Sequence, residues 1–251
     1  MQAAKEFIRM IDDYRRQHGL SFVVRNALPF VLQRAMYYAY ESYVGFDRRY
    51  GTDTTRMLDV QFLDNPSPNA RVATPYGPLS PDRPYGATPR QWLRTWRRFG
   101  SRIDWVPCEH REFTFIDIGS GKGRTLLLAS DYPFRKIIGV ELFPELHAAA
   151  ERNIEAYRSP DQKCTAFELH CMDATQFQFP EDNLFLQFAD PFPAHVLEKV
   201  LANLERSLEA HPRKIFISYW SPRPEHIALL SSKPYLRSAH IHDIWSLYKN
   251  F

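Results

Sequence analysis

The sequence predicts an α/β protein whose sheet is doubly wound and mostly parallel, preceded by an N-terminal helical extension. Two observations predict this fold. From Phe113 onward, short apolar runs alternate with helical patterns, which is typical of a parallel sheet with crossover helices. A glycine turn follows the first apolar run at Gly119. We therefore expect two parts: a helical module with a Pro-rich connection over residues 1–83, and the α/β domain over residues 84–251.

The front part of the chain, up to about residue 62, has the periodicity of helices. Its most apolar stretch runs from Phe22 to Val44 and contains Arg25, Arg34 and Glu41, which argues against a transmembrane segment. The polar positions form a narrow stripe beside a wide apolar face. We expect this helix to pack on the protein itself, and the alternative is a peripheral membrane contact or a partner-binding face over residues 22–44.

Composition is that of a globular protein, with 44% hydrophobic and 24% charged residues. The three cysteines show no C-x-x-C pair and no zinc spacing, so neither a disulfide framework nor a metal site is indicated. The N-terminus lacks the pattern of a signal peptide. These features predict a cytoplasmic protein that binds no metal.

A Pro-rich segment extends from about Asn65 to Arg90 and predicts a long irregular connection. Thr88 and Pro89 then suit the cap and first position of a helix. That helix carries several arginines on one face, which predicts a solvated surface. The alternative is a docking site for an acidic substrate, phospholipid or nucleic acid, and nucleic acid is not favoured.

Six or seven strands are expected in the second part of the chain. The candidate strands are Phe113–Ile118, Lys136–Glu141, Phe167–Cys171, Leu184–Ala189, Lys214–Tyr219 and one or two between Leu236 and Tyr248. The clearest helices between them are Arg124–Ser130, Glu145–Tyr157 and His195–Glu209.

The turn after the first strand has the sequence Asp117-Ile-Gly119-Ser-Gly121-Lys-Gly123. Its glycines allow a sharp turn and a close approach to a ligand. A dinucleotide site has the spacing G-x-G-x-x-G, whereas this turn has G-x-G-x-G with an acid two residues ahead. The carboxylate of Asp117 would disfavour a pyrophosphate and suits a ligand that carries an ammonium group.

The segment from Asp117 to Gly123 resembles the first motif of class I, Rossmann-like methyltransferases, D/E-x-G-x-G-x-G, at every position. The resemblance implies S-adenosylmethionine as cofactor. It also implies that Glu141, at the end of the second strand, accepts hydrogen bonds from the ribose hydroxyls, and that Asp173 accepts from the adenine amino group. The further residues expected at the cofactor are Ser120, Gly121, Arg124, Leu142 and Ala174.

The fourth strand runs into Asp190-Pro191-Phe192-Pro193, which is similar to the N/D-P-P-Y/F motif of amino-group methyltransferases but has Phe192 at the third position. The resemblance implies that Asp190 holds the amine and that Phe192 packs against it. The alternative is a simple strand-ending turn. Tyr219 and Trp220 could offer π faces to a cation, although core packing is the favoured interpretation.

The segment Pro84–Pro89 resembles a stretch that closes over the cofactor in several seven-strand protein-lysine methyltransferases. By this resemblance Tyr85 would take part in catalysis and Thr88 in cofactor binding, although Thr88 has a sufficient role as a helix cap.

These observations predict an S-adenosylmethionine-dependent methyltransferase acting on an amino nitrogen, with a protein lysine first and a small molecule next. The alternative from another class is a non-catalytic cofactor-binding scaffold. An NAD-dependent oxidoreductase is disfavoured by the glycine spacing, and an aminopropyl transferase on the same fold by the Asp190-Pro191-Phe192 pattern.

Overall fold

The computed structural model describes residues 16, 45–54, 103, 106, 108–189, 191–220, 222–241 and 245–251. The predictions for residues 22–44, for the Pro-rich segment and for the arginine-bearing helix after it lie outside these residues. The chain forms two compact units, Met1–Phe46 with Leu79–Ser101 and Asp47–Pro78 with Arg102–Phe251, and every described strand belongs to the second unit. The predicted boundary at residues 83 and 84 stays a prediction.

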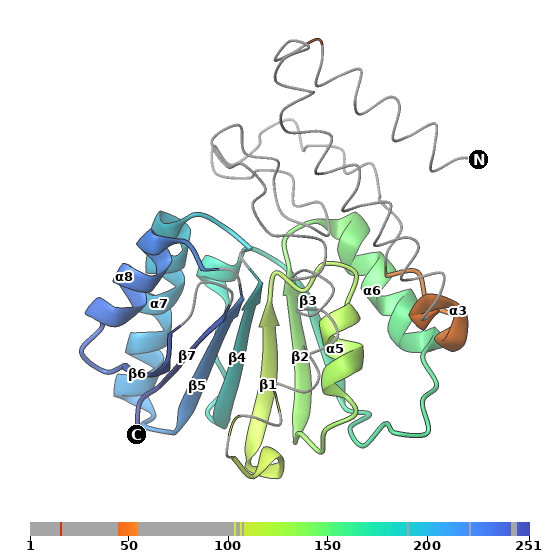
Figure 1. Ribbon diagram of the computed structural model, residues 1–251, viewed down its shortest axis with the longest axis horizontal. Coiled ribbons are helices and arrows are strands. Elements are labelled where there is room, and N and C mark those ends of the chain that lie inside the picture. Colours follow the sequence, from red (N-terminus) through yellow and green to blue (C-terminus); the bar gives the residue numbers. More distant parts are fainter. Residues whose placement is uncertain are drawn as a thin grey trace. The chain divides into compact units, whose positions relative to one another are not determined.

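A seven-stranded sheet has the order β3-β2-β1-β4-β5-β7-β6 (Figure 1). Its strands are β1 (Phe113–Ile118), β2 (Lys136–Glu141), β3 (Phe167–Cys171), β4 (Asn183–Ala189), β5 (Ile215–Trp220), β6 (Arg237–His240) and β7 (Trp245–Lys249). The strands from β1 to β5 pair in parallel, and β7 runs antiparallel to both of its neighbours. This is the strand order of the class I methyltransferase fold, so the predicted doubly wound, mostly parallel sheet is confirmed.

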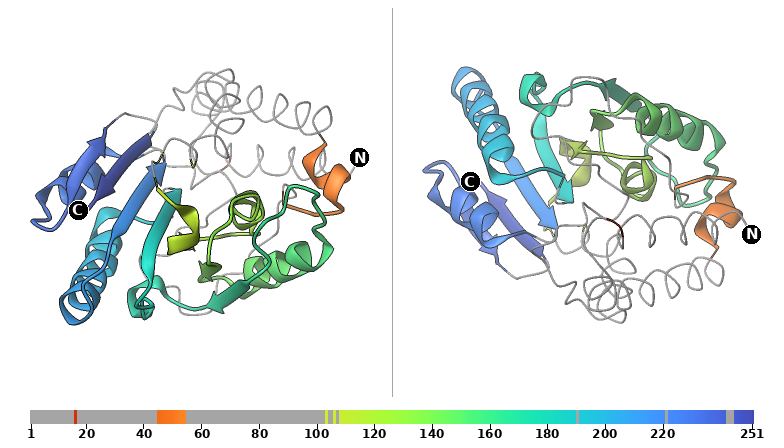
Figure 2. Two further views of the ribbon diagram at one scale, coloured as in Figure 1. Left: turned by 90° about the horizontal axis from the view of Figure 1, so that it is seen from below. Right: turned by 90° about the horizontal axis from the view of Figure 1, so that it is seen from above.

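Helices connect the strands and cover both faces of the sheet (Figure 2). They are α5 (Arg124–Ala129), α6 (Pro144–Ala156), α7 (Ala194–Ala210) and α8 (Pro224–Ser232). Shorter elements are α3 (Phe46–Tyr50) and the 3-10 turns η1 (His110–Glu112) and η2 (Ala174–Gln176). The predicted helices are confirmed within one residue at each end, whereas α8 was not predicted.

The two faces of the sheet follow from the alternation of side chains along each strand. One face carries Ile116, Leu186 and Ile217, which pack in one cluster with Leu201 of α7 and Leu230 of α8. The opposite face carries Gly139, where an added Cβ would lie 2.7 Å from Leu126 Cδ1 of α5. Helices α7 and α8 thus cover one face, and α5 covers the other.

The strand order reverses between β1 and β4, which are neighbours in the sheet. The chain leaves β1 toward α5 on one face and leaves β4 toward α7 on the other. Such a reversal opens a crevice at the carboxyl ends of the strands, which is where open α/β sheets bind ligands. The upper edge of the sheet in Figure 1 is this edge.

Candidate functional site

Three acidic residues lie at the carboxyl edge of three neighbouring strands. Asp117 is the second-last residue of β1, Glu141 is the last residue of β2, and Asp173 follows the end of β3. Because β2 pairs with both β1 and β3 in parallel, the carboxyl ends of all three strands meet at one edge. Asp117 and Glu141 are buried, with exposures of 2% and 6%, whereas Asp173 is exposed.

The glycine turn between β1 and α5 has a left-handed backbone at three positions. The φ angles are 82° at Gly119, 54° at Gly121 and 80° at Gly123, a region that other residues enter at a cost. The Gly119 and Ser120 N–H groups both donate to the carbonyl of Val140 at 2.8 and 3.1 Å. A Cβ built at Gly121 would meet nothing within 4 Å. The turn is thus tied to β2 at its start and open at Gly121.

Asp117 presents a buried oxygen that lacks a partner. Its Oδ1 has no hydrogen-bond partner among the described residues. Burial, and next the negative charge of Glu141, raise the pKa of Asp117 to about 8, against a hydrogen bond from Thr125. An orphaned buried oxygen is costly unless a donor completes it. A ligand with a cationic donor would supply the missing hydrogen bond to Oδ1.

Glu141 connects β2 to the glycine turn. Its Oε2 accepts the N–H of Gly121 at 2.8 Å, and its Oε1 accepts the N–H of Phe143 at 3.0 Å. Burial raises the pKa of Glu141, and the backbone hydrogen bonds oppose this shift. A carboxylate has about four acceptor sites, so Glu141 retains capacity for a further donor beside its backbone partners.

The remaining residues expected at the cofactor occupy the same edge. Asp173 caps η2, since its Oδ1 accepts the N–H of Thr175 at 2.8 Å; this local bond gives it a structural role in addition to any binding role. Ala174 packs against the core cluster. Leu142 is 41% exposed directly after Glu141, and Arg124 begins α5.

The end of β4 approaches the glycine turn. A Cβ at Gly119 would lie 2.5 Å from the Cβ of Pro191, so the two segments are in close contact. Phe192 is half-buried against the core cluster, with its ring 6.2 Å from that of Phe188. Asp190 lies outside the described residues, as do Tyr85 and Thr88.

Tyr219 and Trp220 are core residues. Tyr219 is fully buried and Trp220 is 6% exposed. The Tyr219 ring stacks on Phe188 at 5.5 Å, and its hydroxyl hydrogen-bonds to His226 Nδ1 at 3.1 Å. The favoured interpretation, core packing, is confirmed.

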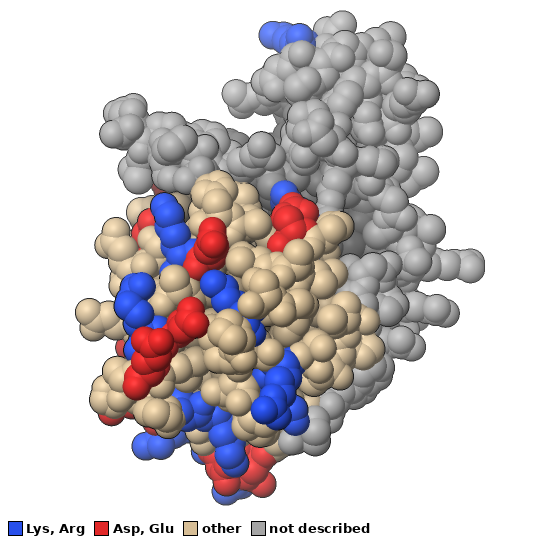
Figure 3. Space-filling view, turned by 90° about the vertical axis from the view of Figure 1, so that its left-hand side faces the viewer, with Lys and Arg blue, Asp and Glu red and all other residues tan. Residues whose placement is uncertain are grey.

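Other kinds of site find little support in the part of the chain that the structure describes. No cluster of His, Cys, Asp and Glu there has the make-up of a metal centre. None of its helices combines the length and apolar character that crossing a bilayer requires. The described residues on the face in Figure 3 show basic and acidic side chains interspersed, without a continuous patch of one sign.

Three residues that the sequence did not single out contact the glycine turn or each other. They are Lys122 within the turn, Asn153 on α6, and Asp53 from a segment far earlier in the chain. In the sequence, these contacts are indicated by Lys122 alone, a lysine inside the expected ligand-binding turn.

Comparison with known proteins gives one family and several structures. Residues 111–201 match the family described as "Putative methyltransferase". No curated protein matches the chain. A SAM-dependent methyltransferase from Aquifex aeolicus is 16% identical, with a TM-score of 0.47 over 62% of this chain and 93% of that one.

Two further solved structures are similar at the same level. An RNA methyltransferase from Salinibacter ruber in complex with S-adenosyl-L-homocysteine is 16% identical, with a TM-score of 0.40 over 60% of this chain and 87% of that one. A TehB-like SAM-dependent methyltransferase from Corynebacterium glutamicum is 15% identical, with a TM-score of 0.44 over 64% and 97%.

The sheet topology is that of the class I methyltransferase fold, and residues 111–201 match a putative methyltransferase family, which together indicate an S-adenosylmethionine-dependent methyltransferase. The cofactor of this class is S-adenosylmethionine. The residues at the sheet edge fit it: the unpartnered oxygen of Asp117 suits its ammonium group, Glu141 retains acceptor sites, and the turn has open space at Gly121.

Proposed function

We propose that this protein transfers the methyl group of S-adenosylmethionine to an amino nitrogen, of a protein lysine or, as the next choice, of a small molecule. The observation that carries the cofactor part of the proposal is the buried, unpartnered Oδ1 of Asp117 beside a left-handed glycine turn. The amino acceptor is supported by the sequence Asp190-Pro191-Phe192-Pro193 at the end of β4.

In this proposal the cofactor lies across the carboxyl ends of β1, β2 and β3. Asp117 accepts from its ammonium group, Glu141 from its ribose hydroxyls and Asp173 from its adenine amino group. The backbone of Gly119, Ser120, Gly121, Gly123 and the start of α5 at Arg124 lie along it, and Leu142 and Ala174 flank the adenine. Asp117 is well suited to this role because an ionic partner stabilises the ionised form that burial disfavours.

When bound, the cofactor supplies an electrophilic methyl group on a sulfonium centre. Transfer would join the lone pair of the acceptor nitrogen to that methyl carbon, and the electron pair of the broken carbon–sulfur bond would stay on sulfur. The protein contributes mainly position, and it must hold the amine unprotonated. Asp190 orients the amine or takes its proton, and Phe192 packs beside the acceptor.

Pro191 supports this assignment of Asp190 because it is the next residue in the chain and lies in contact range of Gly119. The end of β4 and the glycine turn are therefore neighbours, as a transfer between two bound molecules requires. Tyr85 and Thr88 would close over the cofactor in the same scheme, on the resemblance of Pro84–Pro89 to protein-lysine methyltransferases.

The test is to incubate the protein with methyl-labelled S-adenosylmethionine and fractionated cell extract. We expect label in protein, or failing that in small amines, and loss of labelling with Asp190→Ala at nearly unchanged cofactor affinity. Label in oxygen-linked positions or in nucleic acid would contradict the proposed acceptor. Cofactor binding without any transfer would favour the alternative, a non-catalytic scaffold.

A further inference from the structure

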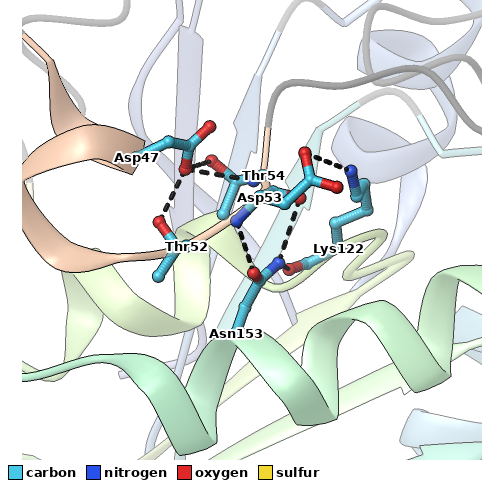
Figure 4. A network of polar contacts seen from close by, with 6 residues as sticks. All are labelled: Asp47, Thr52, Asp53, Thr54, Lys122 and Asn153. Atoms are coloured by element: carbon cyan, nitrogen blue, oxygen red, sulfur yellow. Dashed lines mark hydrogen bonds and ion pairs between the residues drawn. The ribbon is translucent and has the colours of Figure 1, made fainter.

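Lys122 lies within the glycine turn, but its charge is paired with a distant part of the chain. Its side chain is 2% exposed, and its Nζ lies 3.1 Å from Oδ1 of Asp53, whose side chain is 52% exposed (Figure 4). A buried ammonium without a partner is strongly destabilising. The pairing with Asp53 therefore fixes where the lysine of the turn can lie.

Asn153 of α6 holds the same two segments together through its amide group. Its Oδ1 accepts the N–H of Asp53 at 2.6 Å. Its Nδ2 donates to the carbonyl of Lys122 at 2.9 Å and to the carbonyl of Asp53 at 3.3 Å. Asn153 is 3% exposed, so each lost bond would leave a buried polar group unsatisfied.

The segment that carries Asp53 is folded by its own contacts. Oδ1 of Asp47 accepts the hydroxyls of Thr52 and Thr54 at 2.6 and 2.7 Å and the N–H of Thr54 at 3.0 Å. These bonds close a tight turn directly after α3. The turn presents both the backbone and the carboxylate of Asp53 toward Lys122 and Asn153 (Figure 4).

A second contact anchors this segment near the end of α6. The ring of Tyr50 lies 4.8 Å from the ring of Tyr157, which is fully buried. Aromatic pairs at this distance stabilise by about 0.5–1.5 kcal/mol beyond the area they bury. The segment is thus held at two points, one of which is the glycine turn.

The glycine turn is consequently fixed on both sides of the peptide unit that joins Gly121 to Lys122. The N–H of Gly121 is held by Glu141 at 2.8 Å, and the carbonyl of Lys122 is held by Asn153. The flanking glycines adopt positive φ angles, so the free turn has many other conformations to visit. Fixing the peptide reduces the entropy that a ligand must otherwise remove on binding.

We propose that Asp53 and Asn153 are positioning residues for the cofactor, acting through Lys122, and that docking of residues 47–54 is thermodynamically coupled to cofactor binding. The inference rests on the proposed function, since it takes the turn from Gly119 to Gly123 to bind S-adenosylmethionine. Coupling of this kind is reciprocal: if the docked segment strengthens cofactor binding, the bound cofactor strengthens docking by the same factor.

The first measurement is the dissociation constant for S-adenosylhomocysteine by calorimetry on the full chain. We expect Asp53→Asn and Asn153→Ala each to raise it about tenfold. Glu168→Gln is the control for the first, because the carboxylate of Glu168 is 42% exposed and also forms an ion pair with a lysine, Lys136, at 2.8 Å. Asn250→Ala matches the second, because Asn250 likewise accepts a backbone N–H, that of Ile215, and donates to a backbone carbonyl, that of Arg213.

The second measurement is hydrogen exchange of the backbone amide at position 53, which reports docking without any activity. In the wild type, saturating S-adenosylhomocysteine should slow this exchange by the same factor, about tenfold. In Asp53→Asn the slowing should shrink. If Asp53 and Asn153 only stabilise the fold, their variants should have a lower thermal midpoint. The dissociation constant and the ligand-induced slowing of exchange should then equal those of the wild type.

The outcomes separate the two proposals. If the wild type does not bind S-adenosylhomocysteine, the proposed function fails. If the wild type and Asp53→Asn bind S-adenosylhomocysteine equally well, and the ligand does not change the exchange rate at position 53, the coupling is wrong. The proposed function is unaffected by that result. Asp53→Asn alone decides the matter if Asn153→Ala does not fold, because the carboxylate of Asp53 is half-exposed and its replacement keeps the shape.

Discussion

Pro191 lies directly against Gly119, so that a Cβ built on the glycine would fall 2.5 Å from the Cβ of the proline. Gly119 belongs to the turn after β1, and Pro191 follows the end of β4. The two residues follow neighbouring strands, β1 and β4, between which the order of the sheet reverses. Their contact brings the proposed acceptor segment to the proposed cofactor turn, and it requires glycine for space as well as for its φ angle of 82°.

Gly119→Ala should therefore destabilise the protein more than Gly121→Ala. Both positions have positive φ angles, which cost a residue with a Cβ about 1–2 kcal/mol. Gly119→Ala adds a steric clash with Pro191, worth about 1–3 kcal/mol more. Urea unfolding of the two variants measures the difference. Equal free energies of unfolding would show that the segment after β4 moves away from residue 119 at no energetic cost.

Cofactor binding should release a proton at pH 7. The pKa of Asp117 is raised to about 8, so the carboxyl is mostly protonated before binding, and a cationic partner favours its ionised form. The affinity should increase from pH 6 to pH 8 and then level off. Calorimetry in buffers of different ionisation enthalpy should report release of close to one proton in the wild type and less in Asp117→Asn. The same enthalpies for both proteins in every buffer would contradict the pairing.

Stability of the ligand-free protein should fall as the pH rises. The ordinary pKa of Asp117 is 3.8 and the folded value is about 8. Between these values the unfolded chain has lost a proton that the folded protein keeps, so raising the pH favours unfolding by up to about 1.4 kcal/mol per pH unit.

Asp117→Asn removes this contribution and should flatten the dependence. Glu141, whose pKa is also raised, contributes with the same sign in both proteins, so the comparison isolates Asp117. Thermal unfolding from pH 5 to pH 8 tests the prediction. Parallel curves for wild type and variant would show that Asp117 titrates normally.

Cys171 should be protected from alkylation by the cofactor. It ends β3, pairs with Glu141 in the sheet register and is exposed. Burial, and next the charge of Glu141, raise the pKa of its thiol, so labelling is best done above pH 8. In a Cys108→Ser background, saturating S-adenosylhomocysteine should slow labelling of Cys171 severalfold, as followed by peptide mass spectrometry. Labelling at an unchanged rate would mean that the ligand does not reach the end of β3.

The central strands β1 and β2 could be predicted to the residue because their burial makes them nearly continuous apolar runs, and β4 and β5 differ from the predicted bounds by one residue at one or both ends. The edge strand β3 also has the predicted bounds, although none of its positions is buried. The edge strand β6 is exposed at all four positions, so it has no such pattern. Helix α8 is short, with few apolar positions buried, and its periodicity was too brief to recognise.

The acids of the candidate site could be named from the sequence because each lies at or just after the carboxyl end of its strand. The residues that hold the glycine turn from other parts of the chain could not be predicted. The contact of Asp53 with Lys122 joins parts of the chain far apart in sequence, and only the packing of α6 brings Asn153 between them. Likewise, the cap that Asp173 forms with Thr175 depends on local backbone geometry that the resemblance did not include.

A crystal structure of the protein with S-adenosylhomocysteine tests the central claim most directly. We expect one bound ligand across the carboxyl ends of β1, β2 and β3, with its ammonium group at Asp117, its ribose hydroxyls at Glu141 and its adenine amino group at Asp173. A ligand bound elsewhere on the chain, or its adenosyl and ammonium ends lying away from these three carboxylates, would contradict it.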